Sequence, residues 1–180
     1  MKRLFVLLLT LTTITHAVQA GEFSSTVFTR AGNGWEYEKI IAAPDVAKKD
    51  LYDRAKVWVV SNVKSVDVNT LYDDKNQEMI ITTASLAIPN LKYSHLTDQA
   101  LTFKLHLAFK DGKVKVTASG LTYFGISSSR KVYDMPVETL ELKGFVPSPY
   151  KQIQEHFDAA FLGFVKNLEK ALTSAAKNDW

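Results

Sequence analysis

Cysteine is absent from this chain of 180 residues. Its absence excludes disulfides, cysteine nucleophiles and thiolate metal sites, so the fold must depend on its hydrophobic core. Charge of one sign is also scarce, because the formal net charge is +3 and falls to +1 without Lys2 and Arg3. A nucleic-acid partner would require a concentrated basic surface, which this balance does not supply. No apolar run reaches the roughly 20 residues of a membrane-spanning helix. We therefore expect no nucleic-acid partner and no stable membrane insertion.

Residues 1–20 have the layout of a secretory signal peptide. Lys2 and Arg3 give a positive start, Leu4 to Leu11 form a short apolar run, and Ala17 to Ala20 end it with small residues. This layout predicts cleavage before Gly21. We therefore expect an exported protein, either periplasmic or secreted, since a signal peptide is common to both destinations.

The rest of the chain predicts a leader and one domain. Residues 21–34 are polar and dotted with glycine, which predicts a flexible leader. Residues 35–180 are enough for a single domain, since chains of this size bury roughly 70% of their unfolded surface. Residues 35–43 predict a first strand that ends at Pro44. Asp45 is the expected N-cap of a following helix, in which Leu51, Ala55 and Trp58 share one face.

The strongest local pattern is a hairpin centred on Asp111-Gly112. Leu101, Phe103, Leu105, Leu107 and Phe109 alternate with polar residues, and a matching alternation follows the turn. A two-residue Asp-Gly loop predicts a type I′ turn, which places Phe109 opposite Val114 and Leu105 opposite Ala118. Both apolar faces then coincide. The parity of the pattern changes at Gly120, which predicts a β-bulge.

Further strands and a closing helix complete the predicted layer. Residues 65–73 and 78–88 predict strands, and a further strand is expected after the polar loop that begins at Gly125. Pro147 and Pro149 mark the entry to a long amphipathic helix. Its expected apolar face consists of Tyr150, Ile153, Phe157, Ala160, Phe161, Phe164, Val165, Leu168 and Leu172. The order β-α-β-β-β-β-α predicts an α+β fold, with an antiparallel sheet of about five strands and two helices on one face.

Three segments carry a resemblance to a known family. They are the stretch "DLYDRAKVWV" from Asp50 to Val59, the Lys110 to Lys113 hairpin, and the closing helix with Trp180 at its end. Over about residues 35–180 the chain resembles an uncharacterised bacterial domain family described as having a TATA-binding-protein-like (TBP-like) fold. The resemblance implies that fold and export by a Gram-negative bacterium. It supplies no activity and no site residues, and fold alone does not imply DNA binding.

Two sets of residues are candidates for binding. Aromatic residues on the apolar faces predict a packed core, but an incompletely filled space there would take a small apolar ligand. The tentative contacts for that ligand are Tyr52, Trp58, Phe103, Phe157 and Phe161. Lys104, His106 and Lys115 share the polar face of the hairpin, which predicts either a solvated face or a contact surface for an envelope partner.

Evidence for catalysis or a metal is weak. Ser94, His95 and Asp98 lie in one predicted loop, where nearness in sequence does not produce the geometry of a triad. Asp134, with Glu138 and Glu141, offers carboxylates for hydrolysis, and a surface strand is the simpler interpretation. The histidines lack ligand spacing, and the Asp73-Asp74 pair lacks the alternating oxygen ligands of a calcium loop. We predict no catalytic residue, no metal and no cofactor.

These observations favour a non-enzymatic, exported binding or interaction domain of the cell envelope. Its expected partner is an unknown envelope protein. The alternatives are a carrier of a small apolar ligand, held between helices and sheet, and less favourably an envelope hydrolase.

Overall fold

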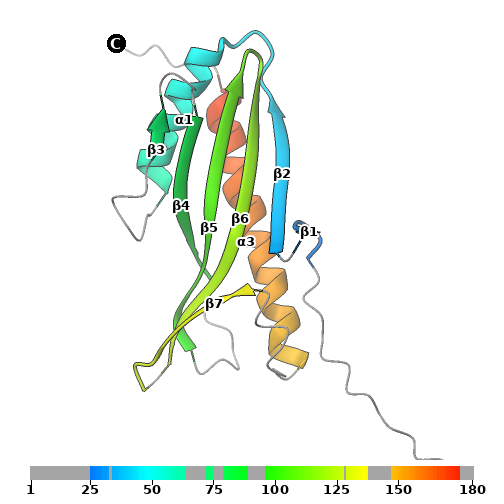
Figure 1. The fold of residues 1–180 in the computed structure, drawn as a ribbon, viewed down its shortest axis with the longest axis vertical. Helices are drawn as coiled ribbons and strands as arrows, with labels where there is room; N and C mark the ends of the chain where they lie inside the picture. The colour runs from blue at the N-terminus through cyan, green and yellow to red at the C-terminus, as the bar shows by residue number, and fades with distance from the viewer. Residues whose placement is uncertain are drawn as a thin grey trace, which may run out of the picture.

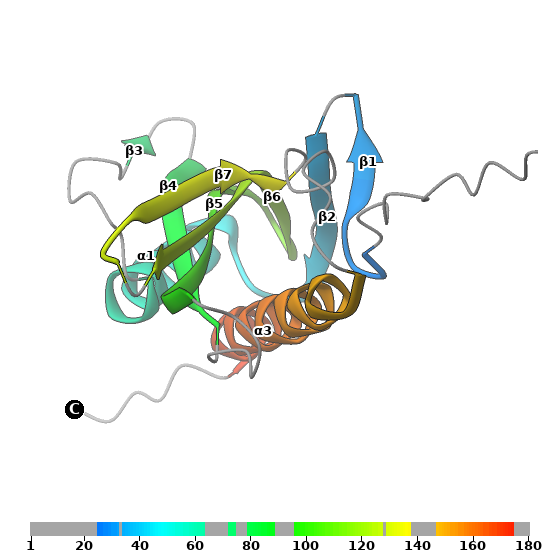
Figure 2. The same cartoon turned by 90° about the horizontal axis from the view of Figure 1, so that it is seen from below.

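The computed structural model describes residues 25–32, 34–63, 72–74, 79–88, 96–127, 129–137 and 147–174. Among these residues, seven strands form one antiparallel sheet in the order β1 (Thr29–Ala31), β2 (Gly34–Ala42), β6 (Lys113–Ser127), β5 (Leu96–Lys110), β4 (Met79–Ala87) and β3 (Tyr72–Asp74), and β7 (Val132–Pro136) pairs with β6. Both helices of the described part lie on the same face of this sheet (Figure 1, Figure 2). The predicted α+β layer is therefore confirmed. The sheet has more strands than the expected five because two short ones, β1 of three residues and β7 of five, extend it.

The element bounds follow the chain in order. The strands are β1 Thr29–Ala31, β2 Gly34–Ala42, β3 Tyr72–Asp74, β4 Met79–Ala87, β5 Leu96–Lys110, β6 Lys113–Ser127 and β7 Val132–Pro136. The helices are α1 Lys48–Asn62 and α3 Pro147–Thr173. The predicted strand 78–88 is confirmed as β4. Most of the predicted strand 65–73 lies outside the described residues, and only its last two residues belong to β3.

The central hairpin has the predicted register. Phe109 is paired with Val114 and Leu105 with Ala118, so the alternating apolar residues from Leu101 to Phe109 and from Val114 to Ala118 are buried on the helix side. The predicted turn type is wrong. A type I′ turn needs a positive φ at both central residues, and of these two only Gly112 has one (71°). The connection between β2 and α1 holds this turn. The Gly112 amide donates to the Val46 carbonyl (3.0 Å), and the Gly112 carbonyl accepts from the Ala43 amide (2.8 Å).

Helix α1 begins two residues later than an Asp45 cap would place it. Asp45 has a φ of 66° and belongs to the turn before the helix. The residue at the N-cap position is Ala47, and its side chain forms no hydrogen bond with the start of the helix. Instead, Oδ1 of Asp111 accepts a hydrogen bond from the Lys48 amide (2.8 Å). The predicted N-cap is therefore wrong. A carboxylate in the hairpin turn satisfies one of the unpaired amides at the start of the helix.

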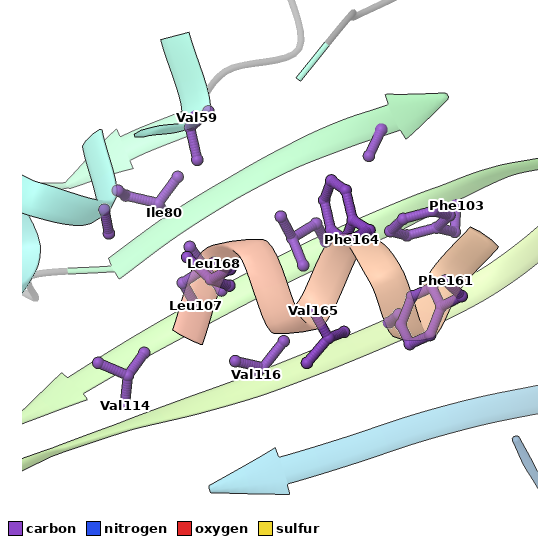
Figure 3. Packing of buried hydrophobic residues seen from close by; sticks show 14 of the residues in the cluster. Val59, Ile80, Phe103, Leu107, Val114, Val116, Phe161, Phe164, Val165 and Leu168 are labelled. Atoms are coloured by element: carbon purple, nitrogen blue, oxygen red, sulfur yellow. The ribbon is translucent and has the colours of Figure 1, made fainter. Parts of the chain in front are cut away.

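The core fills the space between the helices and the sheet (Figure 3). On α3, the predicted apolar stripe is buried at Phe157, Phe161, Phe164, Val165, Leu168 and Leu172. The side chains of Tyr150 and Ile153 lie outside the described part. Phe103 of β5 meets Phe161 and Phe164 with ring centroids 5.2 and 5.5 Å apart. Edge-to-face contacts of this kind stabilise a packed interior beyond the burial of their area.

The predicted flexible leader is packed over its described part. Phe28 is 2% exposed, and its ring lies 4.6 Å from that of Phe161. The carboxylate of Asp158 on α3 accepts hydrogen bonds from the Ser25 hydroxyl (2.6 Å) and the Thr26 amide (2.9 Å). Residues 25–32 therefore belong to the fold, because a buried aromatic ring and a charged hydrogen-bond acceptor hold them on α3. Residues 21–24 lie outside the described part.

Candidate functional site

The sheet face opposite α1 and α3, here called the open face, is the place to look for a partner. Side chains of β4, β5 and β6 alternate between the buried helix side and this face. Of the described helices, neither covers it (Figure 2). The structure brings Lys104, His106 and Lys115 together here, as the alternation predicted. Their role in partner binding remains a prediction.

His106 is the most constrained of these three residues. Cross-strand pairing places it between Ile81 of β4 and Thr117 of β6. Its Nε2 atom is buried and has no hydrogen-bond partner among the described residues. Burial, and to a lesser extent the positive charge of Lys115, hold the pKa of His106 below its ordinary value of 6.5. The ring is therefore neutral at pH 7.

The two lysines differ in their surroundings. The Lys115 ammonium lies 2.8 Å from Oε2 of Glu38 on β2. Both side chains are about half exposed, so this ion pair contributes little stability. Lys104 is exposed and is paired across the sheet with Thr83 of β4. The open face around Lys104 and Lys115 thus carries charges of both signs, with the exposed Ile40 of β2 opposite Lys115.

A hollow of about 560 Å³ lies further along the open face. It is lined by small and hydroxyl side chains from two strands, by one aromatic residue, by one amide residue and by two carboxylates. These are Thr83, Ser85 and Ala87 of β4, Asp98, Gln99, Ala100 and Thr102 of β5, Phe124 of β6 and Asp134 of β7. Asp98 and Asp134 are exposed, and no basic residue lines the hollow. The volume lies within the range of small-molecule pockets.

Two irregularities of the strands shape this hollow. The register of β5 against β6 shifts between Thr97 and Ala100, where Asp98 has a φ of 49°. A second shift lies between Thr102 and Lys104, opposite Gly120, whose φ is 61°. The bulge predicted at Gly120 is confirmed. Bulges increase the local twist of a sheet, which explains how one hollow contacts four successive strands.

Gln99 connects the hollow to the core. Its side chain is buried, and its Oε1 accepts a hydrogen bond from the Tyr123 hydroxyl (2.6 Å). The ring of Tyr123 in turn packs against Phe157 of α3, with centroids 5.8 Å apart. A buried hydrogen-bonded amide fixes its surroundings more firmly than an exposed one. Gln99 in the lining of the hollow is therefore connected to helix α3 through Tyr123 and Phe157.

The residues proposed for an apolar ligand all lie in the core. Tyr52, Trp58, Phe103, Phe157 and Phe161 are each at most 5% exposed. Trp58 packs on Phe164 (4.9 Å) and donates its Nε1 hydrogen to Asn167 Oδ1 (2.6 Å). Tyr52 packs on Phe109 (5.6 Å). These contacts are those of a packed core, and a ligand role for the five residues remains a prediction.

The hydrolase candidates are only partly described. Ser94, His95, Glu138 and Glu141 lie outside the described residues. Asp98 and Asp134, which came from separate sequence arguments, line the same hollow. Among the described residues, no three metal-ligating side chains cluster. The described site can accept hydrogen bonds and attract cations, and it contains no paired nucleophile and base.

Sequence reasoning missed the hollow itself. The available signal was the run of small outward residues on two neighbouring strands: Thr83, Ser85 and Ala87 on one, Ala100 and Thr102 on the other. Small side chains side by side on one face predict a depression, because neighbouring larger residues stand above them. The sequence could not predict that Asp98 and Asp134 line this depression, since their positions depend on the bulge at Asp98 and on the pairing of β7.

Fold and site together define an α+β layer protein of TBP-like architecture, with helices on one sheet face and a hollow on the other. Residues 37–124 match the model of a family described as "Domain of unknown function (DUF4468) with TBP-like fold".

Two solved structures share the fold. A TBP-like protein from Parabacteroides distasonis has 17% sequence identity and a TM-score of 0.59, and the match covers 83% of this chain and 97% of that one. A DUF4468 family protein from Bacteroides ovatus has 10% identity and a TM-score of 0.60, with 84% and 93% covered. At these identities the likeness shows the fold alone. No curated protein matches the chain in sequence.

Proposed function

We propose that the protein is a non-enzymatic binding domain of the cell envelope, which takes its partner in the hollow of the open face. The hollow carries this proposal, because a cavity of about 560 Å³ with a neutral floor and two exposed carboxylates is an arrangement for binding. The described residues offer no catalytic constellation that would act on a bound molecule.

Export is the second part of the proposal, and it rests on residues 1–20. Their positive start, short apolar run and small-residue end have the layout of a secretory signal. None of the described helices is long and apolar enough to cross a membrane. N-terminal sequencing of the protein from its own envelope fraction tests this part. A chain that begins at Gly21 is expected, and an intact Met1 would contradict export by cleavage.

Native mass spectrometry of the gently purified protein tests binding. We expect an added mass on the wild type that is lost in Ala100→Trp, because the indole fills the hollow. Ala42→Trp is the matched control, since Ala42 is exposed on the open face of β2 and does not line the hollow. An added mass that survives Ala100→Trp would contradict binding in the hollow.

A carrier of a small apolar ligand is the second candidate. One observation favours it: the Tyr52 hydroxyl is buried and has no hydrogen-bond partner among the described residues. Buried polar groups without a partner are rare in folded proteins, and a polar atom of a bound ligand would satisfy this one. For a carrier we expect a small, solvent-extractable mass that is retained in Ala100→Trp. The identity of the extracted compound then gives the ligand class.

A further inference from the structure

The hollow of the open face has two ends that differ in chemistry. The first, here called the acidic end, lies where β7 runs beside the lower part of β6 (Figure 1). Phe124 of β6 is paired directly with Asp134 of β7 on one side and with Ala100 of β5 on the other. Residues paired in this way point their side chains to the same face of a sheet. Asp98 stands beside them, in the bulge of β5.

The second end, here called the hydroxyl end, consists of Thr83 and Ser85 of β4 and Thr102 of β5. Ser85 is paired with Thr102 across the sheet. The Thr102 hydroxyl donates to the Thr122 carbonyl (3.2 Å), so its oxygen is still able to accept a hydrogen bond. The hydroxyls of Thr83 and Ser85 form no hydrogen bond within the described part of the chain. Both can therefore donate to a ligand and accept from it.

The carboxylates of the acidic end have no partner of opposite charge. Neither Asp98 nor Asp134 forms an ion pair or a hydrogen bond with the residues that the structure describes, and no basic residue belongs to the described lining. Glu38, elsewhere on the same face, has such a partner, since its carboxylate lies 2.8 Å from the Lys115 ammonium. The acidic end therefore attracts a cation from outside the chain.

An organic ammonium group suits the acidic end better than a metal ion does. A calcium ion takes six to eight oxygen ligands, whereas no three metal-ligating side chains cluster among the described residues. An ammonium group needs one carboxylate as its hydrogen-bond acceptor and tolerates apolar neighbours. Phe124 and Ala100 supply those neighbours between the two carboxylates.

We propose that the ligand of the hollow is a hydroxylated primary amine of the amino-sugar kind. Its ammonium group lies at the acidic end, its hydroxyls bond to the hydroxyl end, and its carbon–hydrogen face lies on Phe124. This inference rests on the proposed function and names the class of ligand. Charge-assisted hydrogen bonds to the carboxylates supply selectivity. A few placed polar groups beside an aromatic residue fix the orientation of a small ligand, and the volume of about 560 Å³ is in the usual range for one.

Three sugars that share one ring are the probes. Glucosamine carries an ammonium group, glucose is neutral and glucuronate carries a carboxylate. At about pH 6 the amine is protonated and the carboxylate is ionised. Binding to the ¹⁵N-labelled protein is followed by chemical shifts, with the amides of Ala100 and Phe124 as reporters of the hollow.

We expect glucosamine to bind about tenfold more tightly than glucose, and glucuronate to bind least. Asp98→Asn combined with Asp134→Asn should weaken glucosamine to the level of glucose and leave glucose unchanged. Asparagine tolerates the positive φ of Asp98 (49°), so the bulge is kept. Glu36→Gln is the matched control, because Glu36 is exposed on β2 and does not line the hollow.

A charge reversal separates recognition from a structural effect. Asp134→Lys combined with Asp98→Asn should make glucuronate the preferred sugar, because the hollow then carries a cation in place of its carboxylates. Asp134 is exposed on β7, so a longer side chain has room there. A merely structural role of the two aspartates would instead weaken all three sugars alike.

Three outcomes would overturn the inference. If the three sugars bind the wild type equally, or if the double asparagine variant still prefers glucosamine, the carboxylates do not select the ligand. If no sugar shifts the amides of the hollow while the envelope partner is still lost in Ala100→Trp, the ligand belongs to another class and the proposed function stands. Failure of the proposed function is distinct, since it requires an envelope partner that ignores Ala100→Trp.

Discussion

Two buried tyrosine hydroxyls differ in a way that stability measurements can detect. The Tyr123 hydroxyl donates to Gln99 at 2.6 Å, whereas the Tyr52 hydroxyl has no partner among the described residues. Tyr123→Phe should lower the free energy of unfolding by about 1–2 kcal/mol, because a buried hydrogen bond is lost. Tyr52→Phe should raise it by about 1 kcal/mol, because an unsatisfied buried group is removed. Urea unfolding checks both, and a loss of stability in Tyr52→Phe would show that the hydroxyl has a partner.

His106 gives the open face a pH dependence. Its pKa lies below 6.5 because burial, and then Lys115, disfavour the charged ring. In the unfolded chain the ring takes up a proton near pH 6.5. The contribution of His106 to stability is thus complete above that pH and is lost as pH falls from 6.5 through the folded pKa. NMR titration should give a midpoint below 6.5, which Lys115→Gln raises only partway, since burial is the larger cause. A midpoint at or above 6.5 in the wild type would contradict this account.

At the scale of elements, the start of α1 depends on the hairpin turn. Asp111 accepts a hydrogen bond from the Lys48 amide across 63 positions of sequence. Asp111→Ala should lower the free energy of unfolding by about 1 kcal/mol, the usual effect of removing a helix-capping side chain. Asp45→Asn is the control and should be near neutral, because asparagine tolerates the positive φ of that turn. Thermal unfolding of both variants decides which aspartate acts at the helix start, and equal losses would contradict the assignment to Asp111.

The same elements show what sequence reasoning can reach. The register of β5 and β6 was predictable, because a period of two over ten residues and a two-residue loop admit one pairing only. The turn type and the helix cap were predicted wrongly. Both depend on the contact of Asp111 and Gly112 with the segment from Ala43 to Lys48, and a local pattern contains no information on that contact. The hollow depends on bulges in two strands, which move residues relative to the regular alternation.

At the scale of the whole molecule, one sheet separates two environments. On the helix side, aromatic rings from the leader, β2, β5 and α3 meet around Phe161, whose ring lies 4.6 Å from Phe28, 4.8 Å from Tyr37 and 5.2 Å from Phe103. On the open face, small residues leave a hollow. Rigid packing on one face holds the strands whose other face forms the proposed site.

Two phenylalanines on opposite faces of the sheet test this separation. Phe161 is fully buried, so Phe161→Ala should lower the free energy of unfolding by about 3–5 kcal/mol. That is a large share of the roughly 5–15 kcal/mol that stabilises a typical domain. Phe124 is only half-buried and lines the hollow, so Phe124→Ala should cost about 1 kcal/mol or less. Urea unfolding measures both losses, and native mass spectrometry of Phe124→Ala measures the partner. We expect the partner to be lost from Phe124→Ala although its fold is intact. If Phe161→Ala instead kept its stability and lost a small apolar mass, the helix side would be a ligand cavity, and the carrier would replace the open-face proposal.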